Sequence, residues 1–432
     1  MGGNISSNTM RMREGNLALL ICRLVMVIVL LAFAMNLSDV APVLAFHNDS
    51  TFSCYGCHNE KGPSDHIYNL IGTDQSSTCL RCHQRNSKLD TGNHYISTPE
   101  TSLSTGEPPL ELTPGGDFGW LKKNYIWKYD YGQTEYSIGE EHGHNIIAAD
   151  YNYEASAAHA TAPGGAYPSS ALNCCSCHDP HGTYRRNADG SITTEGAPIM
   201  ASGSYDDSPD PDINNSVSVY RMLAGIGYQP KSLIESNPFT KDPPAAVAPR
   251  NDNRPETSTQ TRVAYGSGMA EWCKNCHANY NSKSNHPAGN NVKMNALVMA
   301  AYNNYLPGES PMKSYLTLTP FEMGYSDYNQ LKALATTDDS QLKGPVSANV
   351  SCLTCHRAHA SAWNHGLRFN YMAKLTTTKD ANDNASYPDP ERDPTNAQGR
   401  TTAETRKAYY DREATKFGAH RGNLCSKCHA KE

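Results

Sequence analysis

The sequence is poor in apolar side chains for its length. Of its 432 residues, 38% belong to the hydrophobic class AVILMFWYC, whereas 32 are glycine and 26 are proline. Such a chain buries less aliphatic surface than an ordinary globular protein. Charge repulsion does not explain the shortage, because only 19% of the residues are charged and the formal net charge is −6. Something other than side-chain burial must therefore supply part of the core.

Basic stripes and long apolar runs are also missing. No run of Lys and Arg alternates with aromatic residues, and the net charge is negative, so nucleic acid is excluded as a partner. Beyond the N-terminal segment, no stretch approaches the roughly 20 apolar residues that a transmembrane helix requires. We therefore expect no membrane span in the mature chain.

The N-terminal segment has the order of a secretory signal. Three arginines accompany an unbroken apolar run at 24–35, and an A-x-A-like site closes the segment at Val43-Leu44-Ala45. A membrane anchor is the alternative, but Arg23 interrupts the longer apolar stretch. We predict that 1–45 is a cleaved signal peptide and that 46–432 is one exported domain.

Cysteine, by contrast, is abundant and regularly placed. Twelve of the 14 Cys fall into six C-x-x-C-H units, and only Cys22 and Cys175 lie outside this pattern. The units are Cys54/Cys57/His58, Cys79/Cys82/His83, Cys174/Cys177/His178, Cys273/Cys276/His277, Cys352/Cys355/His356 and Cys425/Cys428/His429. This spacing is typical of covalent haem attachment, in which the two thiols form thioethers and the adjacent His binds the iron. The sequence therefore predicts six covalently bound haem c groups.

Three other uses of paired cysteines fit less well. Zinc ribbons and disulfide frameworks require no His directly after each C-x-x-C pair. Redox-active pairs belong to a thioredoxin-like βαβ pattern, which is absent here. Six motifs behind an export signal favour haem attachment over all three.

Six haems would also supply the missing apolar surface. We predict a mostly irregular chain wrapped around a linear haem chain, with short helices at the motifs and very little β structure. Helices are expected at 292–305, 326–335 and 402–417, and surface loops at 202–216 and 380–399. Successive motifs begin 25, 95, 99, 79 and 73 residues apart, so the first two haems form a close pair.

The remaining histidines bear on the choice between an electron carrier and an enzyme. Eleven His lie outside the motifs, a surplus of five over the six distal ligands needed. His181 and His359 each lie three residues beyond a motif His, on the proximal side of their own haem, from where they can reach the next one. All six motifs end in His, and no dedicated acid–base pair is evident. Saturated bis-His irons transfer electrons and bind no substrate, so we expect no enzyme.

Segments between the motifs carry a specific resemblance. They include TPGGDFGW (113–120), GHNI (143–146), CHDPHG (177–182), GYQPKSL (227–233), TQTRVAYG (259–266), HPAGN (286–290) and CHRAHAS (355–361). With them, nearly the whole mature chain resembles the OmcS-type hexahaem cytochromes, outer-surface proteins of metal-reducing bacteria that polymerise into filaments called nanowires.

The resemblance implies six bis-His haems in one unbroken chain, with one distal ligand donated by the neighbouring subunit from near the first motif. The distal candidates are His47, His66, His94, His144, His181, His286 and His359, one more than required. His66 is the candidate for the crossing ligand, although the family carries this His closer to the first motif, and His94 is shifted by one residue. His142, His159, His365 and His420 are expected to be non-ligands, and Cys175 an unused thiol.

The expected function is extracellular electron transfer along a head-to-tail homopolymer, with periplasmic or outer-membrane cytochromes as donors and Fe(III) oxides or partner cells as acceptors. A monomeric carrier in the periplasm or on the cell surface is the alternative, and a multihaem reductase is a third possibility. The monomeric carrier remains an alternative because His66 lies farther from the first motif than the crossing His of the family does.

Overall fold

The computed structural model describes residues 56–59, 69–89, 94–129, 132–195, 209–233, 238–249, 262–280, 288–304, 318–336 and 348–429. All of them belong to one compact unit that spans 45–432. The predicted signal peptide, 1–45, lies outside the described residues. Within the described ranges, no helix is both long and apolar enough to cross a membrane.

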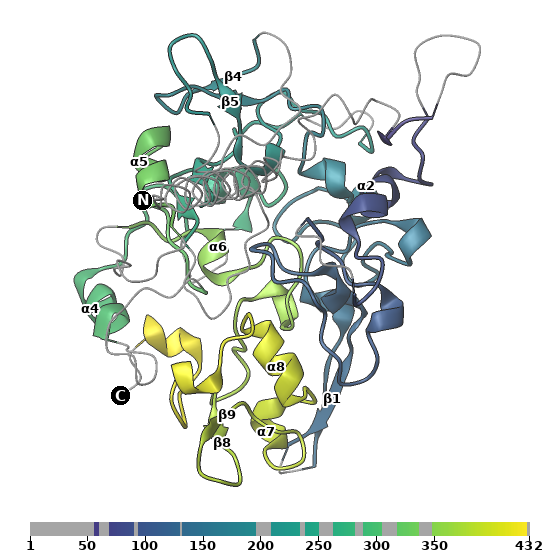
Figure 1. Cartoon of the computed structure of the whole chain (residues 1–432), viewed down its shortest axis with the longest axis vertical. Coiled ribbons are helices and arrows are strands. Elements are labelled where there is room, and N and C mark those ends of the chain that lie inside the picture. The colour runs from purple at the N-terminus through teal and green to yellow at the C-terminus, as the bar shows by residue number, and fades with distance from the viewer. Residues whose placement is uncertain are drawn as a thin grey trace, which may run out of the picture. The chain divides into compact units, whose positions relative to one another are not determined.

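The α-helices are short, as the composition predicted. Among the residues that the structure describes, the longest have nine residues. They are α2 (Gln75–His83), α3 (Met269–Cys273), α4 (Ala296–Asn304), α5 (Tyr328–Leu334), α6 (Cys352–Cys355), α7 (Pro394–Ala397) and α8 (Thr402–Ala408) (Figure 1). Single 3₁₀ turns are η3 (Glu100–Ser102), η4 (Phe118–Lys122), η5 (Gly139–His142), η6 (Ala149–Tyr151), η7 (Ser169–Ala171), η8 (Cys174–Ser176), η9 (Tyr220–Met222), η12 (Asn364–Gly366), η13 (Ala414–Lys416) and η14 (Leu424–Lys427).

All three predicted helices lie within their expected ranges and are shorter than predicted, α8 by the most. Helix α8 starts at a capping box, in which the Thr401 side chain accepts from Glu404 N and the Glu404 carboxylate accepts from Thr401 N. It ends well before 417 because Tyr410 and Asp411 adopt positive φ angles of 59° and 55°, which a right-handed helix does not allow.

In the described ranges the strands are few and form small antiparallel ladders. The largest ladder pairs β1 with β2, and in it Tyr125 faces Ser137. Along β1, buried residues alternate with exposed ones. The strands are β1 (Tyr125–Lys128) with β2 (Thr134–Ser137), β3 (Arg185–Arg186) between β4 (Ile192–Thr193) and β5 (Val217–Ser218), β6 (Ala246–Val247) with β7 (Ala264–Tyr265), and β8 (Thr378–Lys379) with β9 (Ala385–Ser386). The expectation of low strand content is confirmed.

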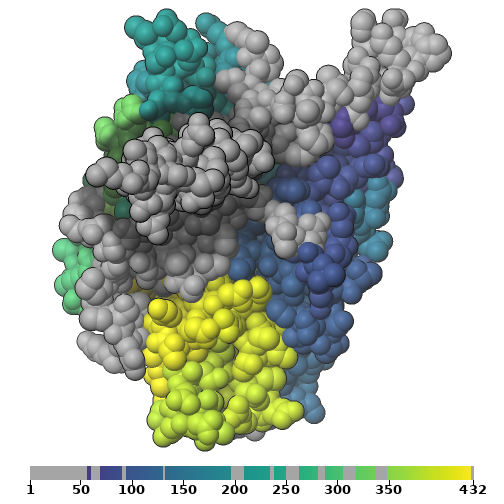
Figure 2. All heavy atoms as spheres, viewed as in Figure 1, coloured from purple at the N-terminus to yellow at the C-terminus, as the bar shows by residue number. Residues whose placement is uncertain are grey.

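The apolar core is divided into several separate clusters. The largest is strongly aromatic and includes Trp120, Trp363, Tyr387, Tyr409 and Phe417. The buried guanidinium of Arg400 stacks on two of its rings, 4.1 Å from the Tyr125 centroid and 4.6 Å from the Trp363 centroid. In Figure 2 the C-terminal residues, in yellow, lie beside the blue segment that contains β1, consistent with the contacts between α7 and β1.

Motif cysteines border these clusters. Cys177 and Cys273 pack against one cluster, Cys174 against a second, Cys425 against the aromatic cluster and Cys428 against a fourth. A single domain usually has one continuous core. Here the attachment cysteines lie at the edges of several cores, where a large apolar group can join one cluster to the next.

Candidate haem attachment sites

Each motif with both cysteines described begins in a helical turn. The turns belong to α2, η8, α3, α6 and η14. In four motifs the N–H of the motif His donates to the carbonyl of the first Cys, as in His178 N to Cys174 O at 3.0 Å and His277 N to Cys273 O at 2.9 Å. One helical turn thus holds both thiols and the imidazole on the same side. In the first motif, Cys57 and His58 are described and Cys54 lies outside the described residues.

Thiols of successive motifs lie close together. Cys79 of the second motif and Cys174 of the third are within hydrogen-bonding reach, as are Cys273 of the fourth and Cys352 of the fifth. The remaining links are electrostatic neighbours: Cys57 with Cys79, Cys177 with Cys276, and Cys355 with Cys425 and Cys428. The attachment points therefore follow one another in space in the order of the sequence.

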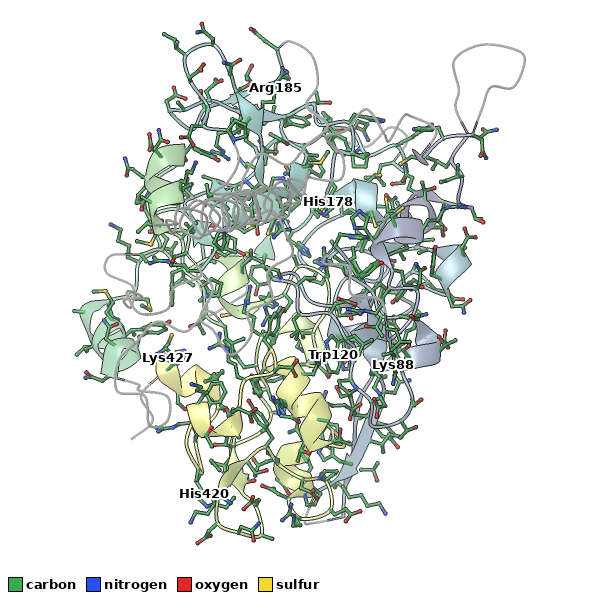
Figure 3. All side chains as sticks on the ribbon, in the orientation of Figure 1. Lys88, Trp120, His178, Arg185, His420 and Lys427 are labelled. Atoms are coloured by element: carbon green, nitrogen blue, oxygen red, sulfur yellow. The ribbon has the colours of Figure 1, made fainter. Side chains whose placement is uncertain are left out.

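The proximal histidines share one orientation. In four motifs the Nδ1 atom of the His is hydrogen-bonded to a backbone carbonyl at 2.8–2.9 Å. The pairs are His83 with His94, His178 with Arg221, His277 with Pro163 and His356 with His365. Such a bond fixes the tautomer and leaves Nε2 as the ring nitrogen that can bind a metal. His178 is labelled in Figure 3.

Cys82 and His429 complete the second and the sixth motif. Cys82 is half-buried near the end of α2, and it acts electrostatically on Tyr151 of η6, so it adds no link to the series of thiols. His429 is exposed, and its N–H donates to Cys425 O at 2.9 Å. Its backbone is therefore held like that of the other motif histidines, but the ring lies at the protein surface. The thioethers and the iron bonds of all six motifs stay predictions from the motif spacing.

The first, third and fifth motifs also share a local fold that the sequence did not reveal. Each proximal His forms an antiparallel bridge with a leucine, and the pairs are His58 with Leu70, His178 with Leu223 and His356 with Leu367. The N–H that follows each leucine donates to the carbonyl of the second motif Cys, at 3.0, 3.0 and 2.7 Å. The leucines lie at unequal distances along the chain, so no sequence period marks this repeat.

Two predicted distal histidines lie opposite proximal ones. The rings of His58 and His181 are stacked with centroids 6.5 Å apart, and those of His277 and His144 are 6.1 Å apart. Two imidazoles bound on opposite sides of one iron, each through a nitrogen–metal bond of about 2 Å, have centroids about 6 Å apart. The spacing of both pairs thus accommodates an iron.

His359 lies in the neighbourhood of the third motif. Among ionisable neighbours, His178 acts most strongly on His359. The His359 ring stacks on Phe118, with the two centroids 4.6 Å apart. Burial, followed by the charge of His178, lowers the His359 pKa to about 3. Enclosure by the protein and the charge of His277 similarly lower the His144 pKa to about 4, although part of this side chain is exposed. Both imidazoles are therefore neutral near pH 7, the form that binds metal.

The other candidates lie differently. The backbone carbonyl of His94 accepts from His83 Nδ1, and the two rings are 5.8 Å apart at 83°. His47, His66 and His286 lie outside the described residues. Among the predicted non-ligands, both ring nitrogens of buried His142 are occupied, by Trp120 O and Ser137 Oγ. His159, His365 and His420 are exposed (His420, Figure 3). The Cys175 thiol contacts Cys79.

Glycines that sequence analysis passed over hold His359 in place. A Cβ on Gly116 (φ +89°) would lie 1.8 Å from Ala360 O, and one on Gly115 would lie 2.8 Å from His359 Nδ1. A Cβ on Gly143 would lie 2.2 Å from the His359 carbonyl oxygen. The backbone around this histidine is therefore packed against glycine from two segments. These glycines lie in the TPGGDFGW and GHNI segments, which sequence analysis selected for their resemblance to the family. Their packing role could therefore have been suspected from the sequence.

Gly116→Ala is expected to destabilise the protein by about 2–4 kcal/mol and to displace His359, because the new methyl group combines backbone strain with a clash. Gly227→Ala is the matched control, since Gly227 also has a positive φ (+84°) but no atom within 4 Å of its Cβ position. Thermal unfolding and the low-spin visible spectrum report both effects. Equal losses in the two variants would contradict the packing argument.

These residues fit covalently attached haem. Thiols come in pairs on helical turns, each described motif places a His beside them, and the spacing of two His pairs leaves room for a metal between the rings. Bound haem would supply the iron that changes its oxidation state, and it would cover the apolar edges at which the cysteines lie. The fold and the sites define a c-type cytochrome.

Comparison with known proteins agrees. The chain is 46% identical over 428 residues to the C-type cytochrome OmcS of Geobacter sulfurreducens, covering 93% of this chain and 98% of that protein. The cryo-EM structure of the OmcS nanowires matches with a TM-score of 0.81, covering 90% of this chain and 100% of that one. A second structure, the Outer Membrane Cytochrome S filament of the same organism, gives 0.80 at 46% identity. No protein-family model matches the chain.

The chain belongs to the OmcS family of c-type cytochromes. It is therefore an electron-transfer protein and not a multihaem reductase, and its cofactor is covalently bound haem c.

Proposed function

We propose that the protein is an extracellular electron conductor that carries six haems and polymerises head to tail into a filament. The observation that carries this proposal is the unbroken spatial series of attachment thiols from the first motif to the sixth. The filaments formed by the 46% identical relative support polymerisation. Periplasmic or outer-membrane cytochromes are the proposed donors, and Fe(III) oxides or partner cells the proposed acceptors.

Intact-mass analysis of the secreted protein is expected to find six haems per chain, with the chain starting at Phe46. A pyridine haemochrome assay, scaled to protein concentration, checks the count independently. Five or fewer haems in protein from a strain with full haem-attachment capacity would contradict the proposed series, because one missing haem leaves a gap in it.

The geometry supports a specific ligation scheme. His181 serves the first iron, His144 the fourth and His359 the third. His94 does not serve the second iron, since its carbonyl lies beside His83 Nδ1 and its ring cannot extend from there to the far side of an iron bound at Nε2. The second, fifth and sixth irons remain, and so do His47, His66 and His286. His286 precedes Ala288–Gly289, where Gly289 N donates to Val350 O beside the fifth motif, so it serves the fifth or sixth iron.

A regularity in this scheme supports a ligand that crosses between subunits. The His three residues after the third motif serves the first iron, and the one three residues after the fifth motif serves the third. In both cases the ligand serves the iron two positions earlier in the series. By the same rule, a ligand that follows the first motif would serve the fifth of the six irons in a neighbouring subunit. A heterologous contact of this kind generates an open filament when it does not close into a ring.

A monomeric carrier is the second candidate, and one observation favours it. Position 61, three residues after His58, is Lys, and the next His is His66. Electron cryo-microscopy of the fraction sheared from cells separates the two functions. Filaments with haems continuous across subunits support the conductor, whereas discrete particles carrying six haems support the carrier.

A further inference from the structure

Glu322 is a buried carboxylate with one oxygen that lacks a partner. Its side chain is 1% exposed, and Met269 N donates to Oε1 at 2.8 Å. Oε2 is buried and accepts no hydrogen bond. A buried carboxylate oxygen without a donor is costly when the group is ionised, and protonation removes most of that cost.

A second carboxylate lies beside it. Glu271 of α3 accepts from Asn290 N at 2.8 Å through Oε1, and its Oε2 is likewise buried without a partner. Burial, followed by the charge of Glu271, raises the Glu322 pKa to about 7. Backbone N–H groups of Gly268 and Ala270 also act on Glu322, and they lower its pKa. The other neighbouring groups are Cys273 and Cys352, with Lys274 acting on Cys352, and Tyr265 and Asn349, whose backbones bridge to that of Glu322.

The pair lies where the fourth and fifth attachments meet. Cys273 and Cys352 are within hydrogen-bonding reach of each other, and Glu322 acts electrostatically on both. Glu271 acts on Cys352 as well. Since these sulfurs carry the two haems, Glu322 is close enough to both for an added electron to act on it.

We propose that Glu322, with Glu271 as its electrostatic partner, takes up a proton when an electron reaches the fourth or fifth haem. The electron comes from the preceding haem and converts one ferric iron to ferrous. One proton comes from solvent and forms an O–H bond at the carboxylate. Both leave when the electron moves on, so charge and atoms balance. Added negative charge in a low-dielectric site raises proton affinity, which is the physical cause of the coupling.

This coupling makes the potentials of the two haems depend on pH. The inference rests on haems at the fourth and fifth motifs, as in the proposed function. Full coupling of one proton to one electron lowers the potential by about 59 mV for each tenfold fall in proton concentration. Glu322 is a tuning group and need not touch iron.

The test is a spectroelectrochemical titration of the secreted six-haem protein between pH 5 and pH 9. In the wild type, two of the haem potentials are expected to fall as pH rises around 7. In Glu322→Gln these potentials should be higher and lose most of that slope, while Oε1 still accepts from Met269. Glu322→Asp should restore part of the slope, and Glu271→Gln should shift the slope to lower pH.

Glu100→Gln is the matched control, because it removes the same charge from an exposed side chain remote from these motifs and should leave the potentials unchanged. An unchanged slope in Glu322→Gln with six haems retained overturns the inference alone. If the wild type lacks haem at the fourth or fifth motif, the proposed function fails first. Infrared difference spectra should show a protonated carboxyl band on reduction of the wild type, and its absence would also overturn the inference.

Discussion

The His66→Ala protein is expected to carry six haems and to remain monomeric under conditions in which the wild type forms filaments. Its haem attachment is unaffected, since all twelve thioether cysteines remain. What it loses is the ligand that we propose to cross from one subunit to the fifth iron of the next, so assembly loses its metal–ligand bond. Negative-stain microscopy and sedimentation measure the loss, which should be nearly complete.

His159→Ala is the control, because His159 is an exposed histidine that we expect to bind no iron. Lys61→Ala is the discriminating variant. If His66→Ala forms normal filaments and Lys61→Ala forms none, the ligand that crosses between subunits is the amine of Lys61. Normal filaments from both would exclude a crossing ligand from this segment.

The second large effect is expected for His359→Gly, which should convert one low-spin haem of the six to high spin. We propose His359 as the distal ligand of the third iron, and glycine leaves that position empty. Visible and electron paramagnetic resonance spectra should show the high-spin fraction, and added imidazole should reverse it. Electron passage along the series should slow, because the altered haem lies between the second and the fourth.

His365→Gly provides the comparison for this variant. His365 is exposed and its carbonyl holds His356 Nδ1, so its side chain is not needed for ligation. A high-spin signal of equal size in both variants would mean that local disruption, and not ligand loss, causes the change. A fully low-spin His359→Gly protein would remove His359 from the ligation scheme.

The composition and the motifs together predicted the class of fold. The composition shows that aliphatic surface is scarce, and the motifs show that haem can replace it. A chain with little aliphatic surface and six C-x-x-C-H units must build its core around haem, and the structure has short helical turns at the motifs between small apolar clusters. The positions of α5 and α8 were also predicted, and the structure shows that Asp327 and Thr401 cap them. The early end of α8 was not, because positive φ at Tyr410 and Asp411 depends on tertiary packing.

Histidine pairing could not be predicted from the sequence. His144 and His277 face each other although they are far apart along the chain, and only folding brings them within 6.1 Å. The bridges from His58, His178 and His356 to leucines were equally hidden, since their loops differ in length. His94 is a histidine and was therefore a candidate ligand. Its backbone carbonyl lies at His83 Nδ1, which argues against binding of the second iron by His94.

The contacts between thiols of different motifs constrain how the protein can be made. An exported chain meets an oxidising compartment, where neighbouring thiols form disulfides. In the folded chain Cys273 touches Cys352, and Cys79 touches both Cys174 and Cys175. A disulfide between Cys273 and Cys352, or between Cys79 and Cys174, would remove a thiol from two motifs at once. Thioether formation within each motif therefore competes with disulfide formation between motifs, which sets an order on biogenesis: the thiols of one motif must be joined to their own haem before they meet those of the next.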